Sequence, residues 1–262
     1  MKLCTLFSGS KGNSTLITNG NTNLLIDAGV SANRICAALR QVNLEPYELD
    51  GILITHEHRD HIGGVGTLSR KYNVPVYANH DTALEMLSVT GNISESNLRE
   101  ICAGGRFEIR DMEIYPFSTP HDAVAPMGYT VRSGDEYTSV ATDLGCLPRN
   151  LLKHLCKSET VLIEANHDVE MLKRGPYPYR LKQRILSEKG HLSNESAAHL
   201  AVQLAVWGTK KIILGHLSEQ NNTPDLALSA VTAALELHGI RTGADVLVRV
   251  APPSEICTFS NA

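Results

Sequence analysis

Histidine and aspartate residues of the kind that bind metal ions gather in one short stretch of this 262-residue chain. Within six positions the chain places His56, His58, Asp60 and His61. Imidazole nitrogens and carboxylate oxygens are the ligands that Zn²⁺ and related divalent ions use in proteins. The stretch follows Asp50–Thr55, a predicted buried strand, and a loop at a strand end lets such side chains converge on one point. We therefore expect a metal site here, rather than a polar loop with chance histidines.

Other ligand-type residues stand at the ends of further predicted strands. A single metal ion with an open position takes three protein ligands and a water, so the four residues of the stretch are too many for one such site. Two ions would need more donors from elsewhere in the chain. The candidates that follow apolar, strand-like runs are Asp27, His121, Asp143 and His216.

The elements that must position these residues mix strands and helices in each half of the chain. Strands are predicted over Cys4–Phe7, Ser14–Thr18, Thr22–Ile26, Asp50–Thr55, Val74–Ala78, Phe107–Ile109, Glu113–Phe117, Tyr129–Arg132, Thr138–Thr142, Thr160–Ala165, 210–216 and Val246–Val250. Helices are predicted over Ala32–Gln41, 63–72, Asp81–Leu87, Pro148–Cys156, Asn194–Val206 (with Asn194 as its cap) and Pro224–Leu237. This mixture favours an α/β sandwich with helices on its outer faces over one doubly wound sheet.

Composition narrows the class of protein. Hydrophobic residues make up 42% and charged residues 20% of the chain, which is typical of a globular protein. The net charge of -4 gives no global basic field for nucleic acid, although a local basic face stays open. No apolar run approaches the ~20 residues of a membrane span. The six cysteines form no CxxC pair, so we expect a cytoplasmic chain with free thiols.

Taken in order, Asp27, the His56–His61 loop, His121, Asp143 and His216 resemble the five motifs of the metallo-β-lactamase superfamily. The resemblance covers nearly the whole chain and implies a four-layer αββα sandwich with a two-metal site at one edge. It also implies one domain over residues 1–262. Asp143 and His216 lie 73 positions apart, which leaves no room for the inserted β-CASP domain of larger relatives.

The same resemblance implies two sets of ligands that share a carboxylate. The sets are His56, His58 and His121 for one divalent ion, and Asp60, His61 and His216 for the other, with Asp143 between them. Asp27 would lie behind the ligands and orient the loop. His167 follows the predicted strand Thr160–Ala165, and we expect it behind the ligands as well. Both Zn²⁺ and Mn²⁺ accept such ligands. Because His58 stands where the redox di-iron members carry a carboxylate, the set favours hydrolysis.

Four further segments are similar to those of the WalJ/YycJ (VicX) family of bacterial metallo-hydrolases. They are LFSGSKGNSTLI, IEANHD, KGHLSNESAA and GHLSEQNNTP. Members of that family process DNA with 5′-to-3′ exonuclease activity. The resemblance implies a binuclear metal-dependent phosphodiesterase that acts on DNA with a 5′-phosphorylated end, using a hydroxide held between two metals. Asp60 would orient that hydroxide, and His191 would neutralise charge on the phosphate or protonate the leaving oxygen.

Candidate substrate-binding residues lie in three places. Ser10, Lys11 and Asn13 belong to a loop whose amides and lysine could cradle a phosphate. Ser193 and Asn194 stand at a predicted helix start, which favours anions. Arg180 lies in the stretch Glu170–Gly190, which is net positive and carries tyrosines that could stack on bases.

Two other functions are alternatives to the exonuclease hypothesis. A small-molecule hydrolase that cleaves a cyclic phosphodiester, thioester or lactone would share the metal site, and only the basic stretch Glu170–Gly190 favours DNA over it. A binding or regulatory module would have no reason to keep the full ligand set. The sequence carries no signal for an oligomeric state.

Overall fold

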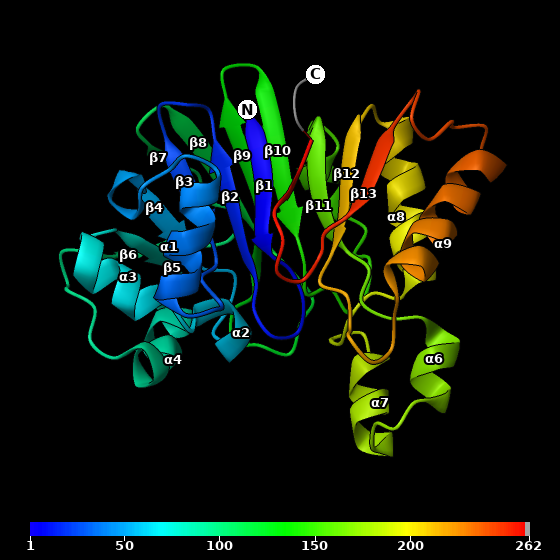
Figure 1. The fold of residues 1–262 in the computed structure, drawn as a ribbon, viewed down its shortest axis with the longest axis horizontal. Coiled ribbons are helices and arrows are strands. Elements are labelled where there is room, and N and C mark those ends of the chain that lie inside the picture. Colours follow the sequence, from blue (N-terminus) through cyan, green and yellow to red (C-terminus); the bar gives the residue numbers. More distant parts are fainter. Residues whose placement is uncertain (260–262) are drawn as a thin grey trace.

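Two sheets of seven strands lie face to face in the computed structural model, which describes residues 1–259 (Figure 1). The first sheet has the order β14-β1-β2-β3-β4-β5-β6. Its strands are β1 (Lys2–Phe7), β2 (Ser14–Thr18), β3 (Asn23–Ile26), β4 (Gly51–Leu53), β5 (Val76–Ala78), β6 (Leu98–Glu100) and β14 (Cys257–Thr258).

The second sheet has the order β13-β12-β11-β10-β9-β8-β7. Its strands are β7 (Phe107–Ile109), β8 (Met112–Ser118), β9 (Met127–Ser133), β10 (Glu136–Ala141), β11 (Thr160–Glu164), β12 (Lys211–Gly215) and β13 (Leu247–Val250). Each half of the chain therefore builds one sheet, and only β14 returns from the end of the chain to the first sheet.

Helices cover the outer face of each sheet (Figure 1). Beside the first sheet lie α1 (Ala32–Gln41), the 3-10 turn η1 (Pro46–Glu48), α2 (Arg59–Ile62), α3 (Val65–Tyr72) and α4 (His80–Thr90). Along the second half the chain forms α5 (Leu151–Leu155), α6 (Val169–Arg174), α7 (Tyr179–Ile185), α8 (Asn194–Val206) and α9 (Pro224–Leu237). The pair α6 and α7 projects from the body as an arm.

Three apolar clusters correspond to the three interfaces between the layers. Leu24, Tyr129 and Leu162 belong to the cluster between the sheets. A second cluster joins the first sheet to α1, α3 and α4, and a third joins the second sheet to α5, α8 and α9. The predicted four-layer α/β sandwich is confirmed.

Parallel pairing explains why distant residues meet at one edge. β3 pairs parallel with β4, and β10, β11 and β12 are parallel neighbours. The carboxyl ends of parallel strands face the same edge of a sheet, which is where ligands bind in such sheets. The segments that follow β3, β4, β10, β11 and β12 therefore open onto a common region.

The structure corrects some local predictions. Ser193, not Asn194, caps α8, because the Ser193 side chain accepts the N–H of Ser196. Five short elements were not predicted, since each is too short to show a clear hydrophobic period: the strands β6 and β14 and the helices α2, α6 and α7.

Among the described residues, no helix combines the length and apolar character that crossing a membrane requires.

Candidate metal centre

Three of the candidate metal-site residues leave their strands in the same unusual backbone conformation. Asp27, Asp143 and His216 have φ values of 58°, 59° and 55°. Few residues other than glycine adopt this left-handed region, and surrounding structure must hold them there. All three are buried. The turn after each strand is therefore shaped to aim a polar side chain at the edge of the sandwich.

The first set of candidate ligands consists of His56, His58 and His121, whose ligand atoms all lie within 4.8 Å of one another. The Nε2 atom of His56 lies 3.0 Å from Nδ1 of His58. On the far side of the His121 ring, Nδ1 donates to the carbonyl oxygen of Gly190 at 3.0 Å. That bond fixes the proton on Nδ1 and leaves Nε2 free to accept a metal ion.

The second set consists of Asp60, His61 and His216, again within 4.8 Å. The Oδ2 atom of Asp60 lies 3.5 Å from Nε2 of His61 and 3.7 Å from Nε2 of His216. Asp27 accepts the Nδ1–H of His61 at 2.7 Å, and it also accepts the backbone N–H and hydroxyl of Thr55. A carboxylate behind a ligating histidine fixes its tautomer and ring orientation.

Asp143 lies between the two sets. Its Oδ2 is 3.5 Å from Nε2 of His61, and its Oδ1 is 3.7 Å from Nε2 of His121. Within the described residues, Asp143 Oδ2 and His216 Nε2 are buried without a hydrogen-bond partner. Because buried polar atoms are nearly always paired, each of these two atoms lacks a partner that a bound cation would supply. The donor set therefore fits a divalent metal ion.

The charges of the cluster shift its titrations strongly. Burial opposes ionisation of Asp60, but His61 and His216 outweigh it and hold the pKa of Asp60 well below its usual range. Burial disfavours the charged imidazoles of His61 and His216, yet the nearby Asp143 carboxylate raises the pKa of both well above the usual value. Metal binding displaces protons from such groups, so affinity depends on pH.

Glu164 is a carboxylate of the candidate site that the sequence analysis missed. It is fully buried at the end of β11, and its Oε1 lies 2.7 Å from Nδ1 of both His191 and His216. Its Oε2 accepts the backbone N–H groups of Leu144 and Leu192. The signal was an acidic residue ending an apolar strand, the same pattern that singled out Asp27.

Comparison with known proteins shows which family this chain belongs to. The sequence profile of the metallo-β-lactamase superfamily matches residues 8–138. The exodeoxyribonuclease WalJ of Streptococcus pneumoniae serotype 2 is 41% identical over 254 residues, which cover 96% of this chain and 94% of the relative. The chain belongs to the metallo-β-lactamase superfamily.

A further relative agrees with this membership, and a solved structure agrees with the fold. The exodeoxyribonuclease YycJ of Bacillus anthracis is 39% identical over 91% of this chain and 90% of its own length. The metallo-β-lactamase fold protein YhfI of Bacillus subtilis superposes with a TM-score of 0.70 at 16% identity, over 99% of this chain and 100% of the other. The resemblance to the superfamily and to its WalJ/YycJ members is thus confirmed.

His191 stands beside the metallo-β-lactamase ligand cluster. Its ring centre lies 5.0 Å from that of His121 and 5.2 Å from that of His216. Glu164 accepts from its Nδ1, which leaves Nε2 as the nitrogen available to a ligand. Its side chain is partly exposed, unlike those of His121 and His216. His191 therefore lies beside the candidate ligands with its ring partly accessible from solvent.

The loop Ser8–Ser14 is divided between buried and exposed residues. Asn13 is buried, with its amide nitrogen 3.1 Å from Nε2 of His61 and 3.5 Å from Oδ2 of Asp60. Ser10 and Lys11 are exposed, and Lys11 pairs with Glu219 at 2.6 Å. Asn13 thus touches the second ligand set, whereas Ser10 and Lys11 lie at its rim.

The other sequence candidates make no side-chain hydrogen bond or ion pair with the candidate ligands within residues 1–259. Asn194 is buried and its amide bonds with that of Asn222, so its side chain is engaged inside the fold. Ser193 serves as the cap of α8. His167 is buried, and neither ring nitrogen has a hydrogen-bond partner within residues 1–259. Arg180 is exposed on α7.

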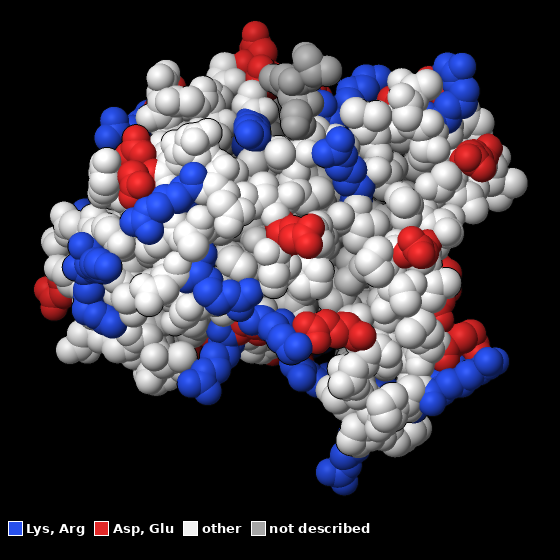
Figure 2. All heavy atoms as spheres, in the orientation of Figure 1, with Lys and Arg blue, Asp and Glu red and all other residues white. Residues whose placement is uncertain are grey.

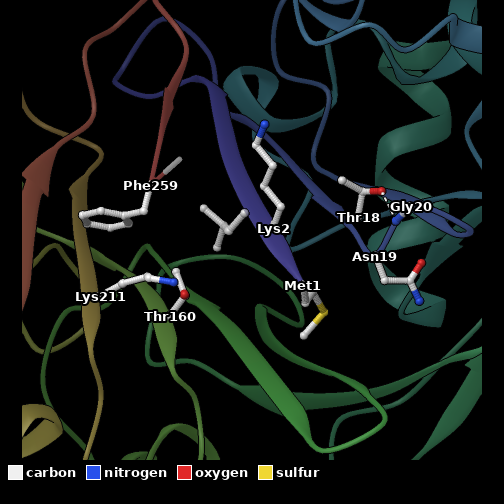
Figure 3. Close-up of a pocket in the computed structure, with 9 residues that line it drawn as sticks. Met1, Lys2, Thr18, Asn19, Gly20, Thr160, Lys211 and Phe259 are labelled. Carbon is white, nitrogen blue, oxygen red and sulfur yellow. Dashed lines mark hydrogen bonds between the residues drawn. The ribbon is translucent and has the colours of Figure 1, made fainter. Parts of the chain in front are cut away.

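An ion pair ties the arm to the metal centre. Arg184 of α7 bonds to Asp122, and the other oxygen of Asp122 lies 3.3 Å from Nε2 of His121. A separate hollow of about 490 Å³, lined by Lys2, Thr160 and Lys211 among others, lies at the opposite end of the sheets, and Figure 3 shows Lys211 reaching toward Thr160. It is lined by residues at the starts of β1, β11 and β12, so it is remote from the histidines.

Proposed function

We propose that the protein is a metal-dependent phosphodiesterase that digests DNA from a 5′-phosphorylated end. The observation that carries the proposal is the pair of three-residue ligand sets that meet at Asp143. Two divalent ions side by side suit in-line displacement at phosphorus. WalJ and YycJ, which match nearly the full chain, are named exodeoxyribonucleases.

The residues would divide the two ions between them. His56, His58 and His121 would hold one ion, Asp60, His61 and His216 the other, and Asp143 would contact both. When bound, Zn²⁺ or Mn²⁺ would lower the pKa of a coordinated water and neutralise charge on the phosphate. Asp60 is partly exposed, unlike His61 and His216 of its own set, so its carboxylate would also accept a hydrogen bond from the attacking water and orient it.

His191 would serve the leaving group. Glu164 accepts its Nδ1–H, so any proton that the ring delivers must come from Nε2. A proton held there would pass to the departing sugar oxygen, or its charge would stabilise the phosphate in the transition state. Because Glu164 is anchored by two backbone N–H groups, it would hold the imidazole in one orientation.

The surface around the site favours a polymer with phosphates over a small molecule. The arm carries exposed Arg180 and Tyr179, and the Tyr179 side chain is 75% exposed. Exposed aromatic and basic side chains are the pair that single strands use for stacking and charge contacts. Figure 2 shows Lys and Arg side chains gathered below the middle of the molecule, around the region where α2 lies in Figure 1.

All six cysteines are free, which supports a reducing, cytoplasmic setting.

The test is digestion of a single DNA strand that carries a 5′-phosphate and a label at either end, with added Mn²⁺ or Zn²⁺. We expect early release of the 5′-terminal nucleotide by the wild-type protein and none by His61→Ala. His199→Ala is the matched control, because His199 is exposed on α8 and away from the ligands. Circular dichroism would verify that His61→Ala is folded.

Two outcomes would contradict the proposal. Early release of the 3′-terminal nucleotide would reverse the direction of digestion. Absence of DNA cleavage, with intact metal binding and rapid hydrolysis of a small phosphodiester or thioester, would assign the site to a small-molecule hydrolase.

A further inference from the structure

A second concave surface adjoins the metal centre. This hollow of about 560 Å³ lies between the loop Ser8–Ser14, the start of α1 and the short helix α2. Asp60 forms part of its wall, and the same Asp60 carboxylate lies 3.5 Å from Nε2 of His61. The hollow therefore opens directly beside the second ligand set. Its volume is within the range of small-molecule sites.

The hollow is lined by positive charge. Its cationic residues are Lys11, Arg34 and Arg59, and its single acidic wall residue within the described chain is Asp60. Lys11 is partly neutralised by Glu219. Arg34 and Arg59 form no ion pair with any residue of 1–259. Two guanidinium groups are thus left to interact with a bound anion.

Arg34 is held in place without losing its charge. Its Nη2 donates to the Ser254 hydroxyl at 3.1 Å, and its guanidinium lies 4.7 Å from the ring centre of Phe7. Both contacts are neutral. By contrast, the arm residues Arg174 and Arg184 are paired with carboxylates. A fixed but unneutralised guanidinium suits phosphate, which arginine binds through parallel N–H groups.

The start of α1 adds to this field. Ser31 precedes the helix and lines the hollow, yet its side chain makes no capping hydrogen bond, and the first turn holds no acidic residue. The N–H of Arg34 donates to the carbonyl of Ser31, and the N–H groups before it, like those that open any helix, have no partner within the helix and carry partial positive charge. With Arg34 in the same first turn, these groups can add to the attraction for an anion.

We propose that this hollow binds the terminal 5′-phosphate of the DNA strand and thereby selects the end at which digestion starts. The inference rests on the proposed function. With the scissile phosphate at the metal centre, the phosphate one nucleotide toward the 5′ end would reach the adjoining hollow beyond Asp60. Arg34 and Arg59 would bind its oxygens, while Lys11 would exchange Glu219 for the phosphate.

The experiment compares two DNA strands of one sequence, labelled at the 3′ end, one with a 5′-phosphate and one with a 5′-hydroxyl. The measured quantity is the ratio of their initial rates of digestion. We expect wild type to prefer the phosphorylated strand, and Arg34→Gln and Arg59→Gln each to lower the ratio about tenfold. Arg40→Gln is the control, since Arg40 lies on α1, outside the hollow, and pairs with Glu45.

Each other outcome has a defined meaning. Equal rates for the two strands with the wild-type protein would overturn the inference and leave the nuclease activity intact. A double variant that slows both strands alike would show that the hollow binds internal phosphates instead, which also overturns it. Failure to digest either strand would contradict the proposed function itself.

Discussion

Glu164 connects two parts of the site that the sequence leaves separate. One carboxylate oxygen holds both His191 and His216 at 2.7 Å, and the other accepts two backbone N–H groups. All four groups that contact the Glu164 carboxylate are N–H donors, so the carboxylate serves only as an acceptor. A glutamine in its place would have to turn an NH₂ group toward donors on one side or the other.

We therefore expect Glu164→Gln to weaken metal affinity or lower the rate of hydrolysis roughly 10–100-fold, as removal of such supporting groups does. Metal titration followed by calorimetry would give the affinity, and digestion of DNA the rate. The control is Glu159→Gln, because Glu159 precedes the same strand but is exposed and paired with Lys211. Wild-type affinity and rate in Glu164→Gln would refute the role given to this carboxylate.

At the scale of residues, the sequence predicted what is local and missed what is made by folding. The stretch His56–His61 shows its chemistry in six positions. The bond between Arg184 and Asp122 joins residues 62 positions apart, and no pattern of spacing announces it. Asn194 was misplaced by one position because Ser193 and Asn194 are both good helix caps.

Among the elements, the turn after β3 and the loop after β4 are packed backbone against backbone. The N–H of Gly29 donates to the carbonyl of Asn13, and the N–H of Asn13 donates to that of Asp60, each at 2.8 Å. A Cβ atom on Gly29 would lie 1.6 Å from the carbonyl oxygen of Asp60. Since the obstacle is backbone, only a shift of the ligand-bearing loop would make room.

Gly29→Ala is thus expected to destabilise the fold by roughly 1–3 kcal/mol, in the range of overpacked sites, and to reduce metal affinity by displacing Asp60. Urea denaturation and metal titration would measure the two effects. Asn33→Ala, at an exposed position of α1, is the control and should change neither. Unchanged stability and affinity in Gly29→Ala would show that the loop yields without cost.

The arm formed by α6 and α7 allows a separate test of DNA binding. Arg180 is exposed there, whereas Lys173 and Arg174 are engaged by Glu170. If Arg180 contacts one phosphate, Arg180→Glu should weaken binding and lower the slope of log affinity against log salt by about 0.7 for a single strand. Fluorescence anisotropy at several salt concentrations would measure this slope.

Lys210→Glu is the matched charge reversal, because Lys210 is exposed next to the start of β12, at the end of the sheet away from the metal centre. It should leave the slope at its wild-type value. An equal change of slope in both variants would mean that only net charge matters and that the arm is no specific DNA contact.

Element bounds followed the strength of the sequence pattern. The structure has Ser14–Thr18, Ala32–Gln41, Asn194–Val206 and Pro224–Leu237 as predicted. These segments carry clear apolar periods and clear ends. Strand β6 is mostly exposed and three residues long, so it has neither. The arm helices α6 and α7 bury few side chains and show little period to read.

For the molecule as a whole, the candidate metal centre joins the two sheets. Asp27 and the stretch His56–His61 come from the first sheet, and His121, Asp143 and His216 come from the second. Its distribution over both sheets could be predicted only through the resemblance to a known family, because no local pattern says which strands will share an edge. That residues 1–262 form one domain stays a prediction.

A centre shared by both sheets couples metal binding to global stability. At a metal concentration 100 times Kd, one site stabilises the folded state by about 2.7 kcal/mol, and for a chain of this size that corresponds to a rise in Tm of roughly 5–10 °C. We expect removal of metal by a chelator to lower Tm by this amount and restored Zn²⁺ or Mn²⁺ to recover it, as measured by calorimetry. In Asp143→Asn the metal-dependent rise should vanish, and the metal-free protein should also lose stability, since His61 and His216 hold the pKa of Asp143 below its usual value and would lose their buried carboxylate partner. If a chelator left Tm unchanged in a protein whose DNA cleavage requires metal, the ions would bind without linking the two sheets.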